Sequence, residues 1–409
     1  MVKMNNPRKI KFIFLAPYRF KKFDIDRYEI KFFKKKFHIE IHDFSKLLYP
    51  HFNSSFKQNY AADKEIKIFK SFEKWKNHIH KIKKSNYKIF ALNLLAIDSY
   101  KAFKILFFIK SMNIKRMDFL NFGIPYYLHE KNLISVFEHY KLKFRELIYR
   151  TRFLIGNLKS KINQYFFNNI IGIFFNIKPD YLFTAGKKFL NDKKKKCIIV
   201  KGNSWDYSRY VRELKKNKKN ININSDYAVF LANSGPKYPT DSHLYKTKVT
   251  ETVKNWYGGL NRFFNNLENK FDLKVIIATH PKAKFEKKIP YLGNRRAYKN
   301  SAMELVKNCK YVITHQSTSL SYATIYKKPI FFIYTNETKK NPGVFKYNKF
   351  LSKLLVGKLI NMNNYSKNNI NHFKINNLKT KYNNYIKNYL TSRLDKKANF
   401  EIITSLIKN

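Results

Sequence analysis

The sequence predicts an α/β protein with two domains, each built on a parallel sheet whose two faces are covered by helices. Apolar runs of about four to six residues alternate with segments of helical period along most of the chain. Apolar strands that alternate with helices are typical of a parallel sheet buried on both faces. The length of 409 residues also exceeds one ordinary domain. We therefore expect two Rossmann-like halves facing a cleft.

The first 125 residues are expected to alternate strand and helix, as a Rossmann-like domain does from its first strand onward. Residues 11–16 form an apolar run that Pro17 ends, and 38–44 alternate apolar and polar side chains. The strands expected in this part are 11–16, 38–44, 87–95 and 119–122, and the helices are 25–35, 65–83 and 102–112.

A long basic and aromatic stretch interrupts this rhythm at about 136–178 and is expected to form a helical insertion. Strands are expected again at 179–186, where Gly186 ends the run, and at 197–200. The first domain is then expected to span residues 1–220.

The second domain is expected to span residues 221–409 and to repeat the same rhythm. Its helix at 250–269 carries an apolar stripe through Trp256, which predicts a core face. The strands expected here are 227–231, 275–279, 311–314 and 329–333, the short helices are 301–308 and 319–326, and a terminal helix at 400–407 is expected to cross back to the first domain.

Composition indicates a folded protein with a strongly basic surface. A hydrophobic fraction of 44%, with 17% aromatic residues, is enough to build cores. The formal net charge of +56 attracts the phosphate groups of nucleic acid, anionic lipid or nucleotide-activated substrates. Lys, Asn, Ile, Phe and Tyr, all favoured by AT-rich coding, are abundant, so coding drift is the alternative source of part of this charge. The charge alone therefore does not name the partner.

The two cysteines, Cys197 and Cys309, each stand beside an apolar run and predict buried thiols. They predict neither a disulfide framework nor a metal site. No apolar run reaches the roughly 18 residues of a membrane span, and residues 12–16 are too few for the apolar core of a signal peptide. We expect a cytoplasmic protein, with the surface of the inner membrane as a further expected location.

The side chains that follow two predicted strands of the second domain form the candidate ligand site. Parallel sheets bind ligands beyond the carboxyl ends of their strands, and hydroxyl and N–H groups at the start of a helix hold anions. The pattern therefore predicts a phosphate-bearing ligand. The candidate residues are His280, Pro281, His315, Ser317, Thr318 and Ser319, with Arg295 as a further candidate for phosphate. The structural alternatives are a turn at His280-Pro281, helix caps at Ser317 and Thr318, a structural His315 and a solvated Arg295-Arg296 pair.

The chain resembles the GT-B glycosyltransferases in three respects. It has two Rossmann-like halves, a His-Pro after one strand of the second half, and a Ser-Thr before the next helix. The pattern is most similar to bacterial enzymes that use CMP-activated sugars: sialyltransferases, polysialyltransferases and the Kdo transferases of capsule assembly. The resemblance, which extends over about 179–333, implies that His280-Pro281 and Ser317-Thr318 hold the phosphate of the donor. It also implies that a carboxylate of the acceptor-side half, the first domain, acts as base.

The sequence departs from the sialyltransferase pattern at this base. It contains no pair of acidic residues followed by Gly, and Asn233 stands where an acidic residue is expected in a relative. Segments 205–207, 230–233 and 239–241 resemble parts of surface-polysaccharide proteins. Asp206 and Asp241 are therefore the candidate catalytic bases, and the alternative for each lone carboxylate is a turn.

We expect the protein to transfer a sugar from a nucleotide-activated donor, with a CMP-sugar favoured, to a growing glycan or a lipid-linked acceptor of capsule or lipopolysaccharide biosynthesis. The departing phosphate needs aimed hydrogen-bond donors, and the acceptor hydroxyl needs a base. The only Asp-x-Asp, formed by Asp24 and Asp26, begins a predicted helix, an ordinary place for carboxylates. We therefore expect no metal, and no cofactor besides the donor.

Two alternatives stay open. The charge, and aromatic residues among lysines, fit a nucleic-acid-binding protein, although no recognition motif occurs and the basic residues spread over the whole chain. The second alternative is a catalytically inactive relative of these enzymes that binds a nucleotide or a glycan. The stretch 141–178, with Arg145, Arg150 and Arg152, is also expected to contact anionic membranes. Its alternative is a core helix whose lysines face water.

Overall fold

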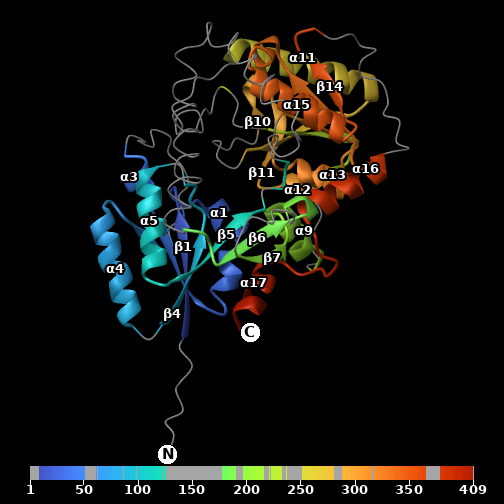
Figure 1. Ribbon diagram of the computed structural model, residues 1–409. Helices are drawn as coiled ribbons and strands as arrows, with labels where there is room; N and C mark the ends of the chain where they lie inside the picture. Colours follow the sequence, from blue (N-terminus) through green and yellow to red (C-terminus); the bar gives the residue numbers. More distant parts are fainter. Residues whose placement is uncertain are drawn as a thin grey trace, which may run out of the picture.

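The computed structural model describes residues 9–50, 61, 63–85, 87–97, 99–121, 123–125, 177–189, 197–215, 221, 223–232, 236, 251–280, 288–315, 317–364 and 378–408. Two seven-stranded sheets organise this part of the chain, one above the other in Figure 1. The helical insertion expected at about 136–178 lies outside the described residues except at 177 and 178.

The first sheet has seven parallel strands in the order β3-β2-β1-β4-β5-β6-β7. Strand β1 pairs with β2 on one side and β4 on the other, so the direction of winding reverses there. The strands are β1 (Lys9–Ala16), β2 (His38–Asp43), β3 (Ile66–Ile68), β4 (Tyr87–Asn93), β5 (Lys115–Leu120), β6 (Tyr181–Ala185) and β7 (Ile198–Gly202).

The second sheet repeats this order. Its six parallel strands run β11-β9-β8-β12-β13-β14, and the short β10 pairs antiparallel with β11 at the edge. Both sheets thus have the strand order of a Rossmann domain, and the predicted fold class is confirmed. The strands are β8 (Tyr227–Leu231), β9 (Lys274–Thr279), β10 (Lys288–Ile289), β11 (Arg295–Lys299), β12 (Tyr311–Thr314), β13 (Ile330–Tyr334) and β14 (Lys358–Asn361).

Helices cover both faces of each sheet. In the first domain, α4 (Phe72–Lys84) and α5 (Tyr100–Ser111) pack on one face, and α1 (Lys22–Arg27), α2 (Ile30–Phe33) and α9 (Trp205–Leu214) pack on the other. In the described part of the chain, no helix combines the length and the apolar composition that a membrane crossing needs. The other helices are α3 (Ser45–Leu48), η2 (Lys187–Phe189), α11 (Val253–Phe271), η3 (Pro290–Leu292), α12 (Ala302–Asn308), α13 (Leu320–Ile325), α14 (Asn336–Lys339), α15 (Pro342–Leu354), α16 (Leu378–Tyr385), η5 (Ile386–Leu390) and α17 (Asn399–Lys408).

Four of the longer helices begin at hydroxyl side chains. Ser71, Ser99, Ser204 and Thr252 each have extended backbone and accept a hydrogen bond from the N–H three residues further on. Each hydroxyl thereby satisfies one of the N–H groups that the first turn of a helix leaves unpaired. Helices α4, α5, α9 and α11 therefore begin where such a cap precedes an apolar stripe.

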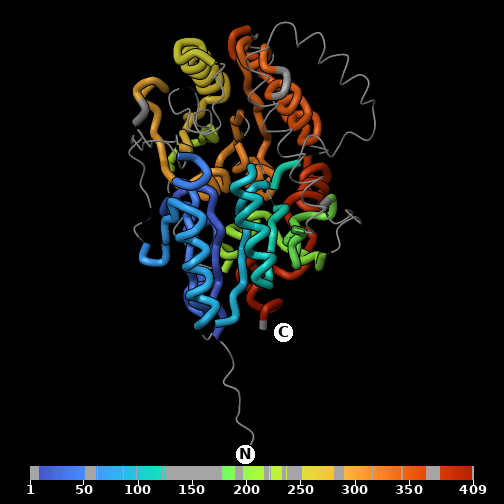
Figure 2. The backbone as a smooth tube through the Cα atoms, turned by 60° about the vertical axis from the view of Figure 1, so that its left-hand side comes forward, coloured from blue at the N-terminus to red at the C-terminus, as the bar shows by residue number. Residues whose placement is uncertain are grey.

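The last helix, α17, returns to the first domain, as the sequence predicts. Ile402 and Ile403 belong to the same buried cluster as Phe12 of β1. Figures 1 and 2 both show the C-terminal end beside the first domain. The two sheets use residues 9–202 and 227–361, and the domain boundary expected near residue 220 falls between them.

Three elements differ from the sequence-based expectation. The helix expected at 25–35 is two helices, because Glu29 has a left-handed φ of 59° between them. The helix expected at 65–83 begins only at Phe72, since the residues of β3 pair with β2. The strand expected at 119–122 lies earlier, as β5, where it pairs with both β4 and β6.

Candidate functional site

The carboxyl ends of the two sheets meet at the boundary between the domains. Helix α9 follows the end of β7, α13 follows the end of β12, and the two helices contact each other. Asp206 at the start of α9 lies 2.7 Å from Ser321 at the start of α13 (Oδ2 to Oγ). Because doubly wound sheets bind ligands at their carboxyl ends, this boundary is the candidate site.

His280 and His315 follow the two strands that flank β8. The register sets Leu231 of β8 beside both Ala278 and Thr314, so the two histidines stand just beyond the same edge of the sheet. Neighbouring strands are about 4.8 Å apart, so the backbones of the two histidines are separated by about 10 Å. The structure thus brings both predicted histidines to one edge, on either side of the end of β8.

His315 is the more buried of the two, with 5% of its surface exposed. Its ring contacts Trp256 of α11 at a centroid distance of 4.8 Å and an angle of 67°. Burial lowers the pKa of His315 to about 4, so the side chain is neutral at pH 7. It can therefore shape the site and hydrogen bond there, but it adds no positive charge.

Residues 317–319 form the turn that leads into α13. Ser317 and Ser319 are half-buried, and Thr318 is exposed. The backbone carbonyls of all three accept hydrogen bonds from the first turn of the helix, with N–O distances of 3.0–3.3 Å. Ser319 is the N-cap residue, and its side chain makes no capping hydrogen bond. The N-cap position thus belongs to Ser319, Ser317 and Thr318 precede it at the carboxyl end of β12, and their role in binding the donor stays a prediction.

Arg295 lies away from the other candidates, at the amino end of β11. All five of its N–H groups donate to protein acceptors: the Glu268 carboxylate, the amide oxygens of Asn261 and Asn265, and the Leu292 carbonyl. No N–H of Arg295 remains for a phosphate at the carboxyl edge. The arginine instead joins β11 to α11, and with 9% of its side chain exposed it is not a solvated residue either.

Asp206 occupies the first turn of α9 and is half-buried. Its Oδ2 accepts a hydrogen bond from Ser321 Oγ at 2.7 Å, and its Oδ1 lies 3.3 Å from the hydroxyl of Tyr322. Arg27 and Arg209 lie near enough for electrostatic interaction with this carboxylate. The predicted base is thus already held by two hydroxyl groups of the other domain.

The remaining predicted site residues, Pro281 and Asp241, lie outside the described residues, as does Asn233. Their roles stay predictions. Asp24, the first carboxylate of the Asp-x-Asp, accepts a hydrogen bond from Lys21 N at 2.9 Å at the start of α1. This contact confirms the helix-start interpretation of that motif.

Polar residues at the carboxyl edge of the first sheet carried no recognisable sequence signal. Asp43 ends β2 beside Ala16, the last residue of β1, and is fully buried. Its Oδ1 accepts a hydrogen bond from Ser45 N at 2.8 Å, and burial raises its pKa. Tyr18 and Tyr28 share a hydrogen bond at 3.2 Å. Only the rule that strand ends carry ligands could have indicated Asp43, because its strand shows an ordinary alternating pattern.

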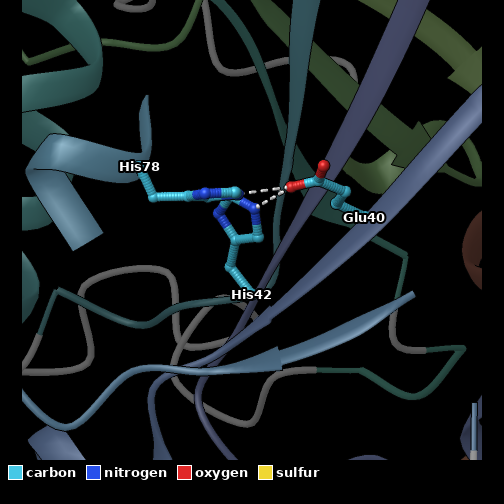
Figure 3. Close-up of side chains that lie close together, drawn as sticks. All are labelled: Glu40, His42 and His78. Carbon is cyan, nitrogen blue, oxygen red and sulfur yellow. Dashed lines mark hydrogen bonds and ion pairs between the residues drawn. The ribbon is translucent and has the colours of Figure 1, made fainter. Parts of the chain in front are cut away.

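Among the described residues, one group has the composition of a metal site: Glu40, His42 and His78. Figure 3 shows both imidazoles pointing at the Glu40 carboxylate, with Nε2–Oε2 distances of 2.7 Å for His78 and 3.0 Å for His42. Trp75 Nε1–H donates to His42 Nδ1 at 3.0 Å, so the proton of neutral His42 is on Nε2. A histidine that binds a metal through Nε2 instead donates from Nδ1. Since Lys11 also contacts Glu40, the group is a hydrogen-bonded cluster.

Comparison with known proteins adds likenesses of fold. No family model and no curated protein matches the chain. Similar solved structures include the spinosyn forosaminyltransferase SpnP, with 9% identity and a TM-score of 0.47 over 98% of this chain and 100% of that one. The wall teichoic acid polymerase TagF has 12% identity and a TM-score of 0.49 over 99% and 91% of the two chains. The UDP-GlcNAc 2-epimerase of Methanocaldococcus jannaschii has 12% identity and a TM-score of 0.45 over 98% and 100%. Likenesses this distant identify no activity, and the fold class rests on the strand order of the two sheets.

Proposed function

We propose that this protein is a glycosyltransferase of surface-polysaccharide biosynthesis that moves a sugar from a nucleotide-activated donor to a glycan or a lipid-linked acceptor. The observation that carries the proposal is the meeting of two carboxyl edges, each belonging to a sheet with Rossmann strand order. Such edges bind nucleotides in doubly wound sheets. The second edge carries His280, Ser317 and Thr318, and the resemblance in sequence favours a CMP-sugar as donor.

In the proposed reaction, the bond between the anomeric carbon and the phosphate oxygen of the donor breaks, and its electron pair stays on the nucleotide. The acceptor oxygen bonds to the anomeric carbon and gives up its proton. The hydroxyl groups of Ser317 and Thr318 and the imidazole of His280 donate hydrogen bonds to the phosphate as its charge develops. Neutral His315 orients the ligand beside them.

The proton of the acceptor hydroxyl passes to a carboxylate base. Asp206 already accepts two hydroxyl groups of the second domain. This engagement favours Asp241 as the base, and the role of Asp241 stays a prediction.

We also propose that the acceptor is met at an anionic membrane surface. Helix α5 exposes 58% of Tyr100 and 39% of Phe107, and Lys101 and Lys110 are exposed on the same helix. Aromatic rings beside lysines suit the interface of an anionic membrane. Because α5 follows the carboxyl end of β4, this surface begins at the sheet edge that carries the proposed acceptor side.

A nucleotide panel tests the donor proposal. CMP, CDP, UDP, GDP and single-stranded DNA are compared by thermal shift at low and moderate salt. We expect a cytidine nucleotide to raise Tm most, and its advantage to survive added salt, because specific hydrogen bonds are screened less than general charge attraction. Equal shifts for every polyanion that vanish together with salt contradict the proposal and favour nucleic-acid binding.

Variants then locate the site. His280→Ala, and the double change Ser317→Ala with Thr318→Ala, each weaken cytidine nucleotide binding about tenfold or more, because each loses a hydrogen bond to a charged phosphate. Arg296→Ala, an exposed change on β11, serves as the control for lost positive charge. Unchanged affinity in both site variants means that the nucleotide binds elsewhere.

A further inference from the structure

The contact between α9 and α13 reaches the loop proposed to bind the donor. Ser321, which meets Asp206 across the domain boundary, also has its Oγ 2.8 Å from the Thr318 carbonyl oxygen. The Ser321 N–H donates to the same carbonyl at 3.3 Å. One residue therefore connects the Asp206 carboxylate of the first domain with the backbone of the loop at 317–319 in the second.

Both hydroxyl partners of Asp206 are buried, Ser321 with 0% and Tyr322 with 2% of the surface exposed. One serine hydroxyl carries one proton, which the Asp206 carboxylate accepts at 2.7 Å, and the Ser321 N–H then holds the Thr318 carbonyl. Without the carboxylate, the Tyr322 hydroxyl is left buried with no acceptor from the first domain, which is a costly state. The start of α13 is therefore fixed partly by a side chain of the other domain.

We propose that Asp206 is a positioning residue: from the first domain it holds the 317–319 loop of the second domain in the conformation that binds the donor phosphate. This role, which rests on the proposed function, replaces that of catalytic base for Asp206. It makes donor affinity depend on the contact between the domains, because the carboxylate reaches Ser321 and Tyr322 only while α9 lies against α13.

The chain offers a matched control on the same helix. Arg209 of α9 also crosses the boundary, where it contacts Glu304 of α12 at 3.2 Å and the Asn300 carbonyl at 3.0 Å. This pair joins the same two domains, and neither of these two contacts involves residues 317–319. Glu304→Gln therefore weakens the domain contact while leaving the Asp206 link to the loop in place.

Hydrogen–deuterium exchange tests the positioning without any ligand. The parent protein is compared with Asp206→Ala, Asp206→Asn and Glu304→Gln, and exchange is followed in peptides covering 314–325. We expect faster exchange there in Asp206→Ala, a smaller change in Asp206→Asn, whose amide oxygen still accepts one hydroxyl, and no change in Glu304→Gln. Exchange that is the same in Asp206→Ala as in the parent overturns the proposal, whether or not the parent binds a nucleotide.

Binding and kinetics test the consequence for the donor. Asp206→Ala weakens binding of the cytidine nucleotide about tenfold and raises the donor KM in proportion, with a smaller effect on kcat. Ser321→Ala has the same direction, and adding it to Asp206→Ala gives little more, because both changes break one connection. A loss of kcat with unchanged donor KM restores Asp206 as the base and contradicts the positioning role. If Asp206→Ala and Glu304→Gln lose the same affinity for the nucleotide, Asp206 acts only as one of several contacts between the domains, which contradicts the proposal.

Discussion

Glu40 lies on β2, a strand whose alternating sequence predicts one solvated face, and yet its carboxylate accepts several hydrogen bonds. His42 and His78 donate to one carboxylate oxygen, and Lys11 donates to the other at 2.9 Å. Helix α4 supplies both Trp75 and His78, so the cluster fastens this helix to the edge of the first sheet. A buried carboxylate is tolerated only with such partners. The alternating pattern of β2 is thus explained by a polar cluster under a helix.

Because of this cluster, we expect the free energy of unfolding of the first domain to decrease in acid. Burial lowers the pKa of His42 from 6.5 to about 4, and the hydrogen bonds of Glu40 lower its pKa even though burial raises it. Both groups bind protons more readily in the unfolded chain. Their contribution is therefore complete above pH 6.5 and falls as the pH drops through 4, by at most about 3 kcal/mol for His42.

Urea unfolding between pH 7 and pH 4 measures this loss. His42→Gln should flatten the pH dependence, because the titrating group is gone. His38→Gln, at an exposed position of the same strand, is the control and should keep the slope of the parent. If His42→Gln keeps that slope as well, the acid sensitivity comes from other groups.

At the scale of whole elements, the C-terminal helix depends on one buried carboxylate. Glu29 is fully buried, and its Oε2 accepts a hydrogen bond from Phe400 N at 2.7 Å, at the start of α17. Its other oxygen accepts from Ser208 Oγ of α9 and lies 3.2 Å from Arg212 Nε. The left-handed backbone of Glu29 gives this side chain its place between α1 and α2. The interruption between α1 and α2 therefore places the carboxylate that holds α17 against the first domain.

We expect Glu29→Ala to lower the free energy of unfolding by about 3 kcal/mol, because it leaves Arg212 buried without this partner. It should also speed amide exchange in α17. Lys215→Ala removes the exposed ion pair of Lys215 with Glu401 of the same helix and should cost under about 1 kcal/mol. Equal destabilisation by the two variants would show that α17 is held mainly by its apolar contacts.

The elements that sequence predicts well are those whose burial leaves a local pattern. The apolar run at 227–231 is observed unchanged as β8, because a strand covered on both faces needs apolar residues throughout. Helix α16 and the π-helix η5 were not predicted, because their buried residues are largely tyrosines among Lys and Asn. Tyr382 and Tyr385 are buried through their rings and donate to the carbonyls of Lys328 and Gly123. Hydrophobic periodicity does not detect such residues.

The same distinction holds for the candidate site: residues that follow a local pattern were predicted, and contacts between distant residues were not. The histidines and hydroxyl residues at strand ends follow from the topology of a parallel sheet, and the structure brings His280, His315 and Ser317 to one edge. The pairing of Asp206 with Ser321 joins residues 115 positions apart on two separate domains. No local pattern encodes such a contact. Arg295 failed as a candidate for a related reason, since its partners on α11 lie 27 to 34 residues earlier in the chain.

At the scale of the whole molecule, the formal charge of +56 makes attraction to any anionic surface unremarkable. What distinguishes one face is the arrangement of aromatic residues on it. Helices α4 and α5 lie side by side over the first sheet (Figure 2) and together carry eight lysines and one glutamate. The rings of Tyr100, Phe103 and Phe107 follow one another along α5 at centroid distances of 6.3 and 5.8 Å. Charge and exposed aromatic surface coincide on this face.

We therefore expect this face to bind anionic vesicles in an orientation that brings the carboxyl edge of the first sheet near the lipid. Tyr100→Ser with Phe107→Ser removes the exposed rings, and Lys101→Glu with Lys110→Glu reverses two charges. Each basic residue near an anionic surface contributes about 1 kcal/mol, so the charge-reversed protein should bind phosphatidylserine vesicles more than tenfold more weakly in co-sedimentation. The control reverses Lys346, Lys349 and Lys353, exposed lysines of α15 in the second domain. It removes more charge from the molecule, so equal or greater loss in the control assigns binding to overall charge. If only the α5 variants lose vesicle binding, the membrane contact is the face of α4 and α5 beside the proposed acceptor side.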